Sequence, residues 1–102
     1  MPTKRTPAEA CRTMPELRDQ IDALDAEIVA LLAERAGYID RATTLKPALG
    51  WPARIPDRIE EVVAKVRGTA ETEGLDPDLT EALWRRLIDW SIAREERGMG
   101  GS

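Results

Sequence analysis

The feature that most constrains this chain of 102 residues is a long helical seam in its N-terminal half. Between Thr13 and Lys46, seam residues recur in alternating steps of four and three, which is the spacing of a coiled coil. The seam consists of Leu17, Ile21, Leu24, Ile28, Leu31, Arg35, Tyr38, Ala42 and Leu45. Thr13 and Glu16 form a capping box around Pro15, which favours a helix start there. We predict one helix from Thr13 to Lys46, because the residue before Pro47 disfavours helical geometry.

This predicted helix is too long to bury its seam within one copy of the chain. At roughly 1.5 Å per residue it would be about 50 Å long. A compact domain of this size has a radius of gyration of only about 13 Å. The seam therefore needs a second chain, and we predict a homodimer.

Two cations stand on this face of the predicted helix. Arg35 occupies a seam position, and Lys46 lies about 20° from it around the helix axis. Arg18 is rotated by about 100° and points elsewhere. A guanidinium in an apolar stripe is costly unless it is paired. Arg35 therefore extends its charged end to solvent, pairs with a core carboxylate such as Glu95, or serves, together with Lys46, a pocket for an anion.

Composition argues against several kinds of function. The formal charge of -4 comes from 15 basic and 19 acidic residues that are well mixed, which argues against a general nucleic-acid binder. Histidine is absent and Cys11 is the single cysteine, so we expect no metal site and no disulfide. The sequence has neither an apolar run of about 20 residues nor the apolar core of a signal peptide. We expect a cytoplasmic protein with no membrane partner.

The second half of the chain predicts two further helices. Pro56 suits the first turn of a helix that runs to about Glu73 and is stopped by Gly74. Asp76 is a suitable N-cap for a third helix that runs to about Arg97. No alternating strand pattern appears anywhere.

We therefore predict an all-α fold of three helices that are long, medium and long. The chain length fits a single domain over residues 1–102. Residues 1–12 are polar and are expected to form a loose N-terminal arm, and residues 98–102 a flexible tail.

Glu95 is a charged residue that extends an apolar stripe on the third predicted helix. Trp84 and Ile88 precede it on that stripe, and Ser91 lies one turn before it. Glu95 is therefore either exposed near the end of the helix or directed into the same pocket as the cations. Cations without a nucleophile, metal or histidine suit a small polycarboxylate and a reaction that needs only restraint and charge stabilisation.

Two runs of residues in the first predicted helix form a specific motif. They are Leu17-Arg18-Asp19-Gln20-Ile21-Asp22-Ala23-Leu24-Asp25 and Leu31-Leu32-Ala33-Glu34-Arg35. With Lys46 and Arg58 downstream, these runs resemble the all-helical (type II) chorismate mutase family over about residues 12–95. The arm with Cys11, the region of Trp90 and the pair Ile92-Ala93 are closer to the isochorismate-pyruvate lyase branch of that family.

This resemblance implies an intertwined helical homodimer with two active sites and no cofactor. Arg18 would bind a carboxylate of the substrate across the dimer interface. Arg35 and Arg58 would bind carboxylates within the site of their own protomer. Lys46 would donate to the ether oxygen of chorismate, where negative charge develops as the C–O bond breaks.

Two residues of the third predicted helix complete the implied site. Glu95 stands where many members carry glutamine, the second donor to the ether oxygen. A glutamate donates only when it is protonated, which burial favours. Ser91 matches a minor contact with the substrate.

The resemblance departs from the mutase pattern at Ile59, where mutases usually place an acid that contacts the ring hydroxyl of chorismate. Ile55 likewise occupies a position that can be acidic. Isochorismate carries its hydroxyl on a different ring carbon, and the lyase branch has an aliphatic residue at the position of Ile59. A hydroxyl without a partner costs roughly 1–3 kcal/mol, which would slow the turnover of chorismate.

We therefore expect a chorismate mutase that forms prephenate, with an isochorismate-pyruvate lyase forming salicylate and pyruvate as the alternative. A third hypothesis is a non-catalytic helical dimerisation module. That module would have Arg35 and Lys46 directed to solvent or paired with acids of the protein. Neither Cys11 nor the loop around Trp51 is given a role by the sequence.

Overall fold

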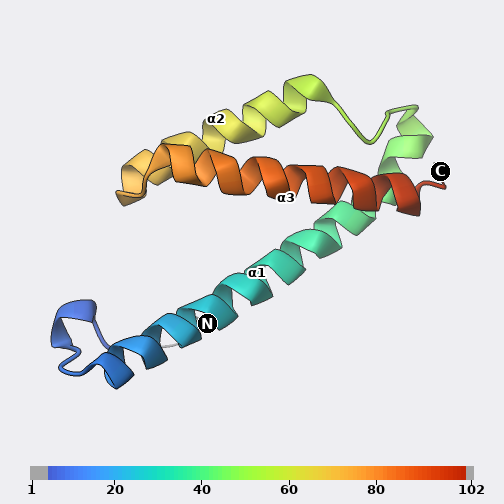
Figure 1. The fold of residues 1–102 in the computed structure, drawn as a ribbon. Coiled ribbons are helices and arrows are strands. Elements are labelled where there is room, and N and C mark those ends of the chain that lie inside the picture. The colour runs from blue at the N-terminus through green and yellow to red at the C-terminus, as the bar shows by residue number, and fades with distance from the viewer. Residues whose placement is uncertain (1–4, 101–102) are drawn as a thin grey trace. The chain divides into compact units, whose positions relative to one another are not determined.

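The computed structural model describes residues 5–100, which form three α-helices after a short 3₁₀ turn at Ala8–Ala10 (Figure 1). The helices are α1 (Met14–Leu49), α2 (Pro56–Glu73) and α3 (Pro77–Gly98). No strand occurs in this described range, so the prediction of an all-α fold is confirmed. Residues 1–4 of the predicted arm and 101–102 of the predicted tail lie outside the described residues.

The chain divides into two compact units, and the boundary between them lies within α1 after Gly37. Unit 1 comprises the described residues up to Gly37, which are the arm and the N-terminal part of α1. Unit 2 comprises the described residues from Tyr38 onward, which are the C-terminal part of α1 together with α2 and α3. Each unit is described separately below.

The start of α1 is capped much as the sequence predicts. The backbone N–H of Glu16 donates to Thr13 Oγ1 at 3.2 Å, as in a capping box. The Glu16 carboxylate accepts from the backbone N–H of Arg12 at 2.7 Å, one residue earlier than that motif specifies. Within the arm, the backbone N–H of Thr6 donates to Gln20 Oε1 at 3.0 Å, and Arg5 forms an ion pair with Glu27. These contacts attach residues 5–12 to α1 within unit 1.

The predicted end of α1 at Lys46 is wrong, because the helix continues through Pro47 to Leu49. A proline in the last turn removes only one helical hydrogen bond, and the next residues supply replacements. Gly50, with φ of 73°, donates to the carbonyl of Pro47, and Trp51 donates to the carbonyl of Lys46. This pair of bonds is a Schellman motif, which satisfies the final carbonyls despite the proline.

The bounds of α2 and α3 agree with the sequence prediction to within one residue. At the end of α2, Gly74 has φ of 77°, and the N–H of Leu75 donates to the carbonyl of Ala70 at 2.8 Å. A residue with a side chain is disfavoured at that backbone conformation, which explains why the helix ends at a glycine. At the start of α3, the Asp76 carboxylate accepts from the N–H of Asp78 at 2.9 Å.

The core lies in unit 2, where α2 and α3 run side by side (Figure 1). Its buried members are Ala53, Val63, Ile88 and Ile92, and the half-buried Ile59, Val62, Trp84 and Met99 pack against them. Each such aliphatic side chain contributes roughly 1.5–3 kcal/mol when fully buried. This cluster fixes the two helices and thereby the floor of the candidate site.

By contrast, α1 has no buried residue along its entire length. Its large apolar side chains are exposed, among them Ile21, Leu24, Ile28, Val29, Leu31, Tyr38 and Leu45. On α3, Leu79, Leu83 and Trp90 are exposed as well. Among the described residues, no helix combines the length and apolar character that a bilayer span requires.

Candidate functional site

Two of the predicted catalytic residues, Lys46 and Glu95, meet in unit 2. Lys46 Nζ lies 2.6 Å from Glu95 Oε1, although 49 positions separate the residues in the chain. The Lys46 ammonium also donates to the backbone carbonyl of Ala53 at 2.8 Å. Glu95 is only 4% exposed, which decides between the two interpretations of this residue, because a surface glutamate of a last turn would be solvated.

The geometry leaves the Lys46 ammonium a remaining hydrogen-bond donor. An ammonium has three N–H groups. Among the described residues, the carbonyl of Ala53 accepts from one of them, whereas Glu95 Oε1 is an ion-pair partner at 2.6 Å that lies outside hydrogen-bond geometry. A further acceptor, such as an oxygen of a ligand, can bind a remaining N–H group without breaking either contact.

Apolar side chains and one hydroxyl adjoin this pair. Ile59 of α2 is half-buried and packs against the cluster that contains Ile88 and Ile92 of α3. Ser91, one turn before Glu95, is buried and donates from Oγ to the carbonyl of Leu87 at 2.8 Å. The pair therefore lies beside a dry surface, where electrostatic interactions are stronger than in water.

The predicted arginines are divided between the two units, with Arg58 in unit 2 and Arg18 and Arg35 in unit 1. Arg58, at the start of α2, has a side chain that is 59% exposed and donates to Glu61 at 2.5 Å. This hydrogen bond holds the pKa of Glu61 below its ordinary value. In unit 1, Arg18 is exposed and Arg35 is half-buried. Within unit 2, the described contacts join Lys46 to Glu95 and pair Arg58 with Glu61.

A cavity of about 250 Å³ opens beside Ile59 in unit 2. Its lining combines an apolar floor with two cations and two acids: Arg54, Pro56, Ile59, Glu60, Arg85, Ile88 and Asp89. Arg54 Nη2 contacts Asp89 Oδ1 at 3.5 Å, and both side chains are exposed. Arg85 binds both carboxylate oxygens of Glu60, which lowers the pKa of Glu60. Sequence patterns do not indicate these pairs, because each pair joins residues more than 20 positions apart.

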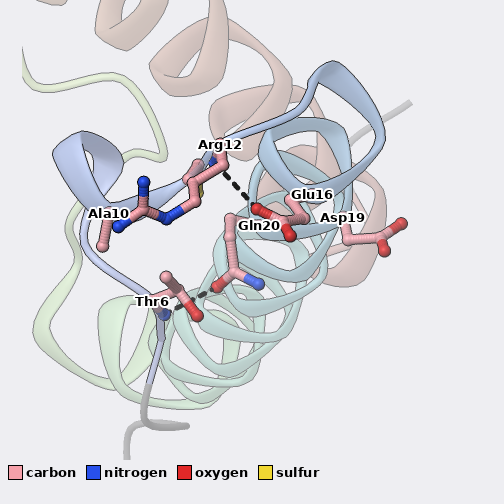
Figure 2. Close-up of a pocket in the computed structure, with 7 residues that line it drawn as sticks. Thr6, Ala10, Arg12, Glu16, Asp19 and Gln20 are labelled. Carbon is pink, nitrogen blue, oxygen red and sulfur yellow. Dashed lines mark hydrogen bonds between the residues drawn. The ribbon is translucent and has the colours of Figure 1, made fainter.

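A second cavity, of about 330 Å³, lies in unit 1 between the arm and the first turns of α1. Figure 2 shows its polar lining, with Thr6 and Arg12 of the arm bonded to Gln20 and Glu16 of the helix. It contains none of the residues predicted for the site. Cys11 also lines it and contacts the carbonyl of Pro7 at 3.7 Å.

Comparison with known proteins finds one family model that covers most of the chain. The model described as chorismate mutase type II matches residues 17–96. This range includes every residue predicted for the site.

Three relatives show how far the likeness extends. The isochorismate pyruvate lyase of Pseudomonas aeruginosa is 33% identical over 92 residues, which cover 89% of this chain and 88% of the lyase. The T-protein of Enterobacter agglomerans is 37% identical over 79 residues, which are 78% of this chain but only 21% of that protein. The chorismate mutase of Methanocaldococcus jannaschii is 25% identical over 84 residues, or 82% of this chain and 85% of that enzyme.

Proposed function

Because the chain belongs to the type II chorismate mutase family, we propose that it converts chorismate to prephenate without a cofactor. The observation that carries this proposal is the contact of Lys46 with Glu95 beside an apolar surface. The rearrangement breaks a C–O bond and forms a C–C bond within one molecule, so it needs no nucleophile. An enzyme accelerates such a reaction by holding the reactive conformer and by stabilising the charge that develops.

In this mechanism Lys46 uses an N–H group that is not bonded to the carbonyl of Ala53. The ether oxygen gains negative charge as its bond to the ring breaks, and an ammonium pointed at that oxygen stabilises the transition state more than the ground state. The carbonyl of Ala53 and the Glu95 carboxyl group hold the lysine in place. Preorganisation of this kind avoids the cost of reorienting a flexible four-carbon side chain during the reaction.

Glu95 has a second task in the proposed mechanism, as a hydrogen-bond donor to the same oxygen. It donates only when it carries a proton. Ser91, buried one turn earlier on α3, and Ile59 on α2 would then contact the substrate.

The arginines bind the two substrate carboxylates in this proposal. A guanidinium matches a carboxylate through two parallel hydrogen bonds. Arg35 and Arg58 would act in the site of their own protomer, and Arg18 would reach the site of a second copy. The exposed position of Arg58 and of Arg18 in a single chain is compatible with a site that is completed only on assembly.

We also propose that the functional form is a homodimer. The apolar seam of α1 has no buried residue in a single chain, and its side chains include Leu24 and Ile28. Leaving such a stripe in water forfeits roughly 1.5–3 kcal/mol for each large aliphatic residue. A second copy offers the same stripe and satisfies both chains at once.

An isochorismate-pyruvate lyase is the second candidate, and Ile59 favours it. An isoleucine cannot accept a hydrogen bond from the ring hydroxyl of chorismate. The likeness to the Pseudomonas lyase also extends over nearly the whole of both chains. A third candidate is the non-catalytic dimerisation module, which predicts that Lys46 pairs with an acid of the protein, as it does with Glu95.

Product analysis separates the three candidates. The purified protein is incubated with chorismate or isochorismate, and products are identified by chromatography and mass spectrometry. We expect prephenate from chorismate. Salicylate and pyruvate from isochorismate, with no prephenate from chorismate, would establish the lyase instead. If neither compound is turned over, the non-catalytic dimerisation module is the candidate that remains. Lys46→Met, which keeps most of the side-chain stem but loses the ammonium, is the matched control.

A further inference from the structure

Two contacts near the Lys46–Glu95 pair join the last turns of α3 to the C-terminal part of α1. Both segments belong to unit 2. Arg94 Nε lies 2.6 Å from Asp40 Oδ1, and Arg94 Nη2 lies 2.9 Å from Asp40 Oδ2. The adjacent residue on α3 is Glu95, and Lys46 follows Asp40 on α1 by less than two helical turns.

The Arg94–Asp40 pair is bidentate, a geometry that restrains the orientation of α3 relative to the C-terminal part of α1. Two parallel N–H···O bonds from a planar guanidinium restrain both distance and angle, whereas an ammonium acts as a point charge. Trp90, one turn earlier on α3, also restrains the guanidinium, whose central carbon lies 5.3 Å from the ring centroid. The bonds lower the pKa of Asp40, so the pair is charged at neutral pH.

A second contact, made by Gly98, is steric rather than electrostatic. A Cβ atom added to Gly98 would lie 2.8 Å from Thr43 Cγ2, closer than real Cβ atoms approach other atoms. Thr43 is β-branched and therefore stiff, and its hydroxyl donates to the carbonyl of Asp40 at 2.6 Å. The glycine thus allows the end of α3 to approach α1 more closely than any other residue would.

We propose that Arg94 is a positioning residue, whose bidentate pair with Asp40, aided by the close approach of Gly98 to Thr43, sets the geometry of the Lys46–Glu95 contact. The proposal rests on the proposed function in so far as that contact serves catalysis. Lys46 has a long flexible stem, so its own contacts do not fix the separation of the two helices. An error of about 1 Å in a catalytic contact costs up to about 100-fold in rate.

The first test compares Arg94→Ala and Arg94→Lys with the wild type, using Arg86→Ala on the exposed face of α3 as the matched control. We expect kcat per folded molecule to fall about 10- to 100-fold in Arg94→Ala, with KM changed less than about twofold. Arg94→Lys keeps the charge but loses the second bond, so its kcat should be intermediate. Asp40→Asn should match Arg94→Ala, and the double variant should be no slower than either single one.

The second test uses the steric contact and leaves the charges unchanged. Gly98→Ala should lower kcat by displacing the end of α3. Adding Thr43→Ser removes the methyl group that the new Cβ would meet but keeps the hydroxyl, so the double variant should recover most of the lost rate. A rise in KM with unchanged kcat in these variants would overturn the positioning role, as would a rate per folded molecule equal to that of the wild type.

A readout that needs no activity separates this proposal from the proposed function. The rate of acetylation of the Lys46 amine is followed by mass spectrometry, with the exposed Lys65 as an internal reference. Arg94→Ala should speed acetylation of Lys46 several-fold and leave Lys65 unchanged. If the wild type turns over neither substrate, the proposed function fails, while faster acetylation still supports the structural part of this proposal. An unchanged acetylation rate at Lys46 would overturn it.

Discussion

The two units of the chain differ in where they place their apolar side chains. Unit 2 has a buried cluster between α2 and α3, which includes Val63, Ile88 and Ile92. Unit 1 has no buried residue on its part of α1, although that part carries most of the apolar seam. Burial of this apolar cluster stabilises unit 2 within a single chain. The described part of unit 1 contains no such buried cluster.

In the proposed site, the two units would contribute different groups of residues. Lys46 and Glu95, the proposed catalytic pair, are held by contacts inside unit 2, where the core holds the helices. Arg18 and Arg35 belong to unit 1. In the proposed dimer, the unit without a core would be stabilised by association, and its arginines would be placed by the same event.

The largest expected effect comes from breaking the proposed association through unit 1. Ile28, 51% exposed in the single chain, is a seam residue, and Ile28→Glu would place an unpaired charge in the dimer interface. We expect dissociation at micromolar concentration and a loss of activity of at least about 100-fold, since each 1.4 kcal/mol weakens association about tenfold. Sedimentation velocity measures the first effect and product formation the second.

The matched control for Ile28→Glu is Ala26→Glu. It adds the same charge about 160° away around the helix and should leave both properties unchanged. A stable folded monomer of the wild type at micromolar concentration would contradict the dimer and the role of Arg18 across the interface.

Arg35→Ala tests whether unit 1 contributes to binding as well as to association. A lost charged hydrogen-bond pair costs roughly 1.5–3 kcal/mol, so kcat/KM should fall about 10- to 150-fold. The free energy of unfolding should change far less, and the exposed Arg41→Ala on the same helix should be nearly neutral. Unfolding of Arg35→Ala with normal activity per folded molecule would make Arg35 a structural residue.

Ile59→Glu tests substrate choice within unit 2. The new carboxylate offers an acceptor to the ring hydroxyl of chorismate and an unmatched charge to isochorismate. We expect the ratio of kcat/KM for chorismate over isochorismate to rise about 5- to 150-fold, which corresponds to roughly 1–3 kcal/mol. Ile59→Leu keeps the side chain apolar and should leave the ratio near that of the wild type. An unchanged ratio in Ile59→Glu would mean that this position does not face the ring.

The outlines of both units were predictable from the sequence, because local chemistry determines them. Gly74 and Asp76 end one helix and begin the next through bonds to near neighbours. Pro47 misled the prediction, since its effect depends on whether a glycine follows to satisfy the last carbonyls. The seam predicted a need for a partner, and the absence of buried residues on α1 supports that prediction.

The contacts of the proposed catalytic pair were not predictable to the same extent. Periodicity placed Lys46 and Glu95 on helices but left open whether Glu95 is buried, because that depends on how the end of α3 lies against the C-terminal part of α1. This approach is held by Arg94 and Asp40, which are 54 residues apart, and by one glycine. The other partner of Lys46 is a backbone carbonyl, at Ala53, and a carbonyl has no signature in a sequence.

Glu95→Gln tests whether residue 95 acts as a hydrogen-bond donor to the ether oxygen. An amide donates at every pH, whereas a carboxyl group donates only when protonated. We therefore expect the kcat of Glu95→Gln to exceed that of the wild type at alkaline pH. Glu96→Gln, the exposed neighbour, is the control. Overlaying profiles of kcat against pH would show that Lys46 acts without a proton on Glu95.

The smallest expected effect concerns an ion-pair network on the surface of unit 2. Glu81 accepts from Arg85 at 2.7 Å and from Arg67 at 2.8 Å, and these hydrogen bonds, with that from Arg85 first, lower the pKa of Glu81 below its ordinary value of 4.5. Arg85 also binds Glu60, whose pKa is lowered in the same way. Because the folded pKa values are depressed, this stabilisation is present above the ordinary value and is lost as pH falls through the folded pKa.

Arg85→Met removes the cation that joins these acids and keeps an unbranched apolar stem. At about pH 7 its Tm should be lower than that of the wild type by no more than about 4 °C, since exposed pairs contribute little and salt screens them. As pH falls below the lowered folded pKa values of Glu60 and Glu81, the two Tm values should converge. Arg86→Met, next to it but exposed, should show no such dependence on pH. A Tm difference that persists at low pH would mean that Arg85 stabilises α3 through the packing of its stem rather than through charge, and unit 2 would then depend on its apolar contacts alone.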